Sequence, residues 1–228
     1  MSRDRHPPKP SDGGEMVTIQ IPCESKFYVH ANLLVHYSRY FKAALGAPME
    51  EAKSMHFNLE EHASNNIMSI YIDWIYERGY TRQIPFRIKK LSAHELIAAW
   101  LLGDYLQTPK FQNDIMKHLY AAGSKNTSSD DMANAAVQHL GKGWVPAQCQ
   151  MHKFLIDVLI RYISTPGVVE KTRVEALKHL NLDEVCAIGI NFADRLARVK
   201  NEADRSWLTD VVENLFSFSG NFLVDEQF

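Results

Sequence analysis

The sequence predicts an α+β domain followed by an all-helical region. Two segments near the N-terminus alternate apolar and polar residues, which is the period of a half-buried β-strand. Most of the remaining chain repeats its apolar residues at the spacing of amphipathic helices. With 228 residues, 46% of them hydrophobic, the chain can bury one large core or two smaller ones.

The first predicted element is a β-hairpin. Residues 1–15 are rich in proline, glycine and charge, and we expect them to be disordered. Residues 16–21 alternate cleanly, and a proline-containing turn leads into a second alternating strand at 26–29. Phe27 and Val29 are two positions apart, so both face the same side of this strand.

Two helices separated by a serine are predicted next. Leu33, Leu34 and Tyr37 recur at helical spacing. Ser38 is a residue type that caps helix N-termini, and the residues after it again follow a helical period. The apolar stripe expected on the second helix consists of Phe41, Ala44 and Leu45.

A break at 46–48 follows, and a third short strand is predicted at 56–59. Residues 64–78 have the clearest amphipathic pattern in the chain, and Gly79 is placed to terminate this helix. Core packing accounts for its apolar positions, which are Ile67, Ile70, Tyr71, Trp74 and Ile75.

A loop and two more helices complete the α+β domain. Residues 80–91 carry mixed charge and a proline, and we expect a loop. Ser92 and Glu95 have the spacing of a capping box, which predicts a helix start. Residues 108–109 suit the N-cap and first turn of another helix, ending before Gly123. The apolar faces of these two helices are Leu96, Ala99, Trp100 and Tyr105, and then Phe111, Ile115 and Leu119.

Residues 126–218 are predicted to be helical throughout. Ser129 is the expected N-cap of a helix over 130–140, and Gly141 is its expected stop. Further helices are expected at 154–162, 168–179, 183–200 and 207–216. The predicted segments are a disordered tail at 1–15, the α+β domain at 16–122, a helical region at 123–218 and a tail at 219–228.

Composition and charge exclude several classes of partner. The chain carries a formal net charge of -2 with a pI of about 6.5, and no basic face with aromatic platforms is visible. The densest basic stretch, 87–90, is interpreted as a solvated loop, so we expect no nucleic acid partner. No apolar run approaches the ~18 residues that cross a bilayer, and residues 1–14 lack the apolar segment of a signal peptide. We therefore expect no membrane association.

The reactive residue types are scattered. Cys23, Cys149 and Cys186 are far apart and odd in number, which argues against a disulfide framework and favours reduced thiols in the cytoplasm or nucleus. No nucleophile elbow, zinc motif or phosphate loop occurs. His30 is expected to pack beneath the helix with a backbone hydrogen bond rather than to act as a base. We expect no catalytic residues, no cofactor and no metal, and therefore a non-enzymatic protein.

The order of residues in the hairpin and the first two helices resembles the opening of BTB/POZ domains, F-x-V-H-K-x-L-L followed by S-x-Y-F-x-A-x-L. The matching residues are Phe27, Val29, His30, Leu33, Leu34, Ser38, Tyr40 and Phe41. Residues 96–105 and 109–113 are similar to a segment that fungal BTB proteins carry. The resemblance implies a BTB/POZ fold over 16–122, with a small three-stranded sheet and a helical cluster, and it implies a protein-interaction module.

The same resemblance suggests one contact site. BTB adaptors of cullin ubiquitin ligases carry a hydrophobic-x-Glu element in the loop after the Ser38 helix, and here Met49 and Glu51 occupy that pattern. A flexible thioether suits a shallow groove on a partner, and a carboxylate accepts charge-assisted hydrogen bonds. The alternative is a solvated acidic loop in which Met49 covers the core.

Two departures from the family bear on assembly. Where dimeric relatives carry opposite charges at the dimer seam, this chain has Met16 and Ala31. We therefore expect a monomer or a weak homodimer. Three functions stay open from the sequence: a cullin adaptor, an oligomerisation or regulatory scaffold without a ligase role, and an enzyme whose site has no recognisable motif.

Overall fold

The chain divides into two compact units, Met1–Ala122 and Gly123–Phe228. The computed structural model describes residues 8, 14–21, 25–48, 50–59, 63–80, 85–124, 129–147, 149–163, 188 and 190. Met49, most of both predicted tails and the helices predicted at 168–179, 183–200 and 207–216 lie outside the described residues.

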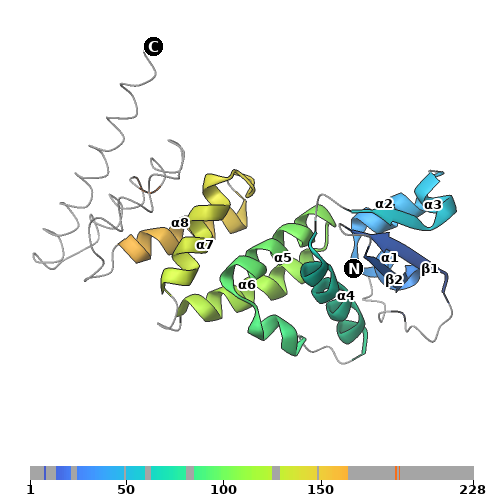
Figure 1. Cartoon of the computed structure of the whole chain (residues 1–228), viewed down its shortest axis with the longest axis horizontal. Helices are drawn as coiled ribbons and strands as arrows, with labels where there is room; N and C mark the ends of the chain where they lie inside the picture. The colour runs from blue at the N-terminus through green and yellow to red at the C-terminus, as the bar shows by residue number, and fades with distance from the viewer. Residues whose placement is uncertain are drawn as a thin grey trace, which may run out of the picture. The chain divides into compact units, whose positions relative to one another are not determined.

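A three-stranded sheet forms one part of the first unit, with β1 (Met16–Gln20) at its centre (Figure 1). β2 (Lys26–His30) pairs with β1 antiparallel, and β3 (His56–Asn58) pairs with it parallel. The register places Ile19 opposite both Phe27 and Phe57. One face of the sheet is therefore apolar and packs into the core, and all three predicted strands are confirmed.

The connection from β2 to β3 contains three helices, α1 (Ala31–Tyr37), α2 (Arg39–Gly46) and α3 (Glu50–Ser54). Ser38 is the N-cap of α2, as predicted, because its Oγ accepts a hydrogen bond from the Phe41 amide at 3.1 Å. The same hydroxyl donates to the Leu106 carbonyl at 2.6 Å. Ser38 thus ties the first two helices to the end of α5.

Helix α4 (Asn65–Tyr80) supplies the largest buried side chains of the unit, Trp74 and Tyr71. The prediction that Gly79 ends this helix is wrong, since α4 continues to Tyr80. A glycine inside a helix costs only about 1 kcal/mol relative to alanine. Arg78 binds Asp114 of α6 and anchors the last turn, which favours the longer helix.

The segment predicted as a loop at 80–91 contains a short 3-10 helix, η2 (Phe86–Lys90). Pro85 precedes it, and the Ile88 amide donates to the Pro85 carbonyl at 3.1 Å. Ile88 is buried and anchors the turn. A single buried residue in five produces no periodic signal, which is why the sequence did not indicate this element.

Helices α5 (Ala93–Tyr105) and α6 (Pro109–Ser124) complete the first unit's helices. The predicted capping box is confirmed, because Ser92 and Glu95 exchange both hydrogen bonds. Helix α6 runs past the predicted stop at Gly123. At Gly103 an added Cβ would lie 2.9 Å from a side-chain carbon of Gln112, so the close approach of α5 to α6 requires glycine.

The second unit contains two described helices, α7 (Ser129–Gly141) and α8 (Gln150–Ile163), which pack against each other (Figure 1). Their buried residues include Met132, Ala136, Leu155 and Leu159. The Cys149 sulfur accepts a hydrogen bond from the His152 amide at 3.3 Å, at the start of α8. A small sheet with many helices confirms the predicted α+β class.

Candidate protein-interaction site

Most residues of the BTB-like motif belong to the core of the first unit. Val29, Leu33, Leu34 and Phe41 are fully buried, and Ser38 is 1% exposed. Phe27, His30 and Tyr40 are half-buried. The motif residues as a group therefore specify folding, and the half-buried members are the ones that reach the surface.

His30 has a side-chain partner instead of the expected backbone partner. Its Nδ1 lies 2.7 Å from the Tyr76 hydroxyl, and its backbone amide donates to the same oxygen at 3.3 Å. His30 thereby fastens the end of β2 to α4.

The segment that contains Glu51 is helical, so its prediction as an exposed loop is wrong. Glu50 and Glu51 stand in the first turn of α3 and Lys53 in the last, which favours the helix through its dipole. The Ser54 hydroxyl donates to the Glu50 carbonyl at 2.8 Å. Helix α3 has no buried residue, and Glu51 is exposed. Its side chains therefore contribute little to the core.

Tyr40 of a neighbouring helix stands near Glu51, and Tyr105 packs against Tyr40. The rings of Tyr40 of α2 and Tyr105 of α5 have centroids 5.3 Å apart and are tilted by 39°. Burial, a hydrogen bond with Tyr105 and the charges of Tyr105 and Glu51 raise the pKa of Tyr40 to about 12. The Tyr40 hydroxyl is therefore neutral at physiological pH. We call Tyr40, Glu51 and Tyr105 the α3 surface.

Sequence reasoning found Glu51 but not its tyrosine neighbours. Tyr40 was assigned to the motif and Tyr105 to the core, whereas the structure leaves both half-buried. A signal was present for Tyr40, since its position lies beside Phe41 and off the predicted apolar stripe of α2. No local signal joins Tyr105 to Tyr40, because they are far apart in sequence.

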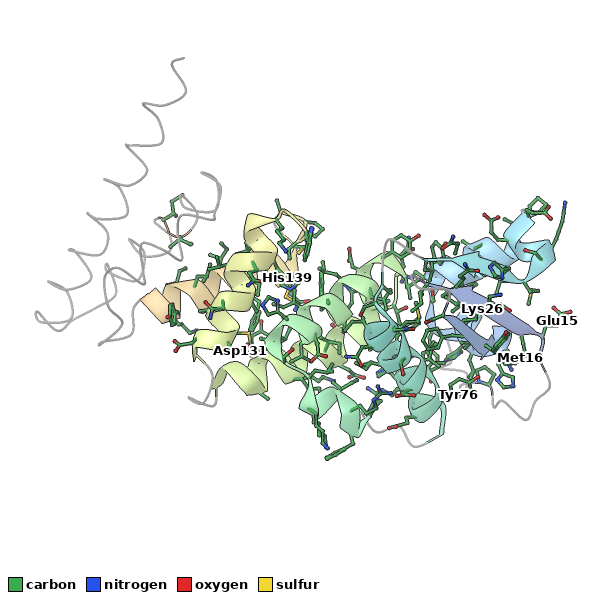
Figure 2. All side chains as sticks on the ribbon, in the orientation of Figure 1. Glu15, Met16, Lys26, Tyr76, Asp131 and His139 are labelled. Atoms are coloured by element: carbon green, nitrogen blue, oxygen red, sulfur yellow. The ribbon has the colours of Figure 1, made fainter. Side chains whose placement is uncertain are left out.

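The outer face of the sheet is the second exposed surface. The structure brings Met16 and Ala31 to the same end of it, because Met16 pairs with His30 and the Ala31 amide donates to the Glu15 carbonyl at 2.9 Å. Figure 2 labels Glu15 and Met16 at this end of the sheet. Met16 is 42% exposed and Tyr28, two residue pairs along and so on the same face, is 62% exposed. This face presents two large apolar side chains to solvent.

Comparison with known proteins returned no match, either among protein-family models or among curated proteins. Within the part of the chain that the structure describes, no three His, Cys, Asp or Glu side chains gather in a group that could hold a metal ion. None of the described helices combines the length and apolar character needed to cross a bilayer.

Proposed function

We propose that the first unit is a BTB/POZ-type protein-interaction module that serves as a substrate adaptor for a cullin-based ubiquitin ligase. The observation that carries the proposal is α3, a helix with no buried residue that stands beside the Tyr40–Tyr105 pair. Because α3 contributes little to the core, its side chains are available for contact with a partner. The order of strands and helices and the buried BTB-like motif support the choice of family.

The chemistry of the α3 surface suits a partner with an apolar ridge and a basic group. Tyrosine rings offer large contact area at a low entropic cost, and their neutral hydroxyls can donate or accept hydrogen bonds. The Glu51 carboxylate would accept a charge-assisted hydrogen bond from an arginine or lysine of the partner. Because Glu51 is exposed, its contribution falls mainly on association rate and specificity.

Isothermal titration calorimetry with the amino-terminal domain of a cullin tests this function. We expect Glu51→Ala to weaken binding about three- to tenfold, and Glu50→Ala, which removes the same charge from the same helix, to change it by less than about twofold. Absence of detectable binding by the unaltered protein would refute the adaptor function. Equal effects of the two variants would refute this surface.

Met49 is tested in the same titration. Burying a methionine side chain stabilises a complex by roughly 1.5–3 kcal/mol, so Met49→Ala is expected to weaken cullin binding about tenfold or more. Unchanged affinity of a Met49→Ala, Glu51→Ala double variant would remove the hydrophobic-x-Glu element from the proposal.

A second function, an oligomerisation scaffold, is favoured by the exposed Met16 and Tyr28 on the outer sheet face. A contact between two such faces would bury both side chains. Light scattering distinguishes the two functions. A scaffold predicts a dimer at low micromolar concentration that Tyr28→Glu dissociates, whereas an adaptor that acts alone predicts the mass of one chain.

A further inference from the structure

Helix α6 and η2 bring basic side chains together around one histidine. The Nε2 atom of His118 is buried and has no hydrogen-bond partner among the residues that the structure describes. Burial lowers the pKa of His118, the charges of Lys89 and Lys117 lower it further, and Asp114 acts in the opposite direction. Lys89 of η2 and Lys117 of α6 are therefore both near the same ring. We call Phe86, Lys89, Lys90, Lys117 and His118 the η2–α6 patch.

The positive charge of this patch is only partly neutralised. Asp114 is the carboxylate partner of both Arg78 and Lys117, and Arg87 pairs with Asp73. Lys89 and Lys90 form no ion pair with any carboxylate in the described part of the chain. Lys89 and Lys90 therefore add two positive charges to this turn that no described carboxylate pairs with, while the whole chain carries -2.

An apolar side chain stands within this positive region. Phe86 is 65% exposed, and the Lys90 ammonium lies 4.7 Å from the centre of its ring. Ile88, which precedes the two lysines, is buried and holds η2 to the unit, so the exposed ring and the ammonium groups project from an anchored turn. An exposed aromatic ring flanked by ammonium groups complements an apolar side chain flanked by carboxylates.

We propose that the η2–α6 patch binds an acidic peptide segment of a partner protein. Carboxylates of the peptide pair with Lys89 and Lys117, and an apolar side chain of the peptide covers Phe86. A peptide is favoured over a nucleic acid because one exposed ring offers no platform for successive bases. The site is independent of the α3 surface and of the function proposed for it.

Binding of such a peptide has a consequence at His118. A carboxylate placed between Lys89 and Lys117 offsets the positive charges that disfavour the protonated ring. The pKa of His118 therefore rises when the peptide binds. By linkage, the affinity for the peptide increases as the pH falls through the interval between the pKa of His118 in the bound state and its pKa in the free state. This readout reports on the patch itself and not on the net charge of the protein.

Fluorescence anisotropy with a fluorescein-labelled peptide of glutamates flanking one central leucine tests the proposal on the full chain. Lys89→Gln with Lys117→Gln is expected to weaken binding at least tenfold. Lys42→Gln with Lys53→Gln, which removes the same charge from exposed positions on α2 and α3, is expected to change it less than threefold. Histidine NMR spectra are expected to show a higher pKa for His118 in the bound state.

Three results would overturn the proposal. The first is no binding of the peptide by the unaltered protein at 100 mM salt. The second is equal weakening by the two double variants, which would mean that net charge alone attracts the peptide. The third is tighter binding of a single-stranded oligonucleotide than of the peptide in competition, which would make the patch a nucleic-acid site.

Discussion

Asp114 and Glu51 are both acidic residues on helices of the first unit, and their surroundings are opposite. Asp114 is 1% exposed and accepts hydrogen bonds from Trp74 at 3.0 Å, Arg78 at 2.6 Å and Lys117 at 3.2 Å. Glu51 is exposed on a helix that buries nothing. The Asp114 carboxylate is held by hydrogen bonds inside the fold, whereas the Glu51 carboxylate is available to a partner. The groups around each carboxylate therefore decide whether it stabilises the fold or can bind another protein.

The largest expected effect is at Asp114. Asp114→Ala removes the carboxylate that accepts hydrogen bonds from the Trp74 indole nitrogen and from the partly buried Arg78 guanidinium. Breaking a buried pair on one side costs about 3–5 kcal/mol. Urea denaturation should show this loss in Asp114→Ala, whereas Lys117→Ala should cost less than about 1 kcal/mol because Lys117 is 67% exposed. Equal effects of the two variants would contradict the assignment.

A smaller loss is expected at Ser38. Ser38→Ala removes both the cap of α2 and the hydrogen bond to the Leu106 carbonyl, which together should cost about 2 kcal/mol. Ser54→Ala is the matched change at an exposed serine, and it should cost less than about 0.5 kcal/mol. Urea denaturation checks both variants. A Ser38→Ala protein as stable as the parent would show that the Ser38 cap contributes nothing to the free energy of unfolding.

His118, near Asp114, is expected to make stability depend on pH. Its pKa is lowered in the folded protein, so the unfolded chain binds the proton more readily. The contribution of His118 is present above the ordinary value of 6.5 and is lost as the pH falls below it. Urea midpoints measured between pH 5 and 8 should decline less in His118→Gln than in the parent protein. Equal declines of the urea midpoint with pH in the two proteins would contradict the role assigned to His118.

The difference between the two carboxylates also explains what the sequence could predict. The Ser38 cap, the Ser92–Glu95 capping box and the alternating strands are local patterns, and the structure confirms each. Two of the three partners of Asp114, Arg78 and Trp74, lie 36 and 40 residues away in sequence, so no local pattern indicates them. Long-range pairing of this kind is decided by how helices pack.

The short helix α3 is also not predictable from the sequence. Helix α3 has five residues and none is buried, so it has no apolar stripe that could predict it. Its helical form follows instead from the placement of charge along it. The α3 surface was missed for a related reason, because Tyr40 and Tyr105 meet only through the packing of α2 and α5.

Hydrogen exchange of the full chain with and without a cullin amino-terminal domain compares both regions in one measurement. The account predicts slower exchange of amides in α2 and α3 in the complex, and unchanged exchange in the parts of α4 and α6 around Arg78 and Asp114, because the cullin is proposed to contact the α3 surface. Protection around Asp114 with none in α3, or no protection anywhere, would contradict the proposed interaction site.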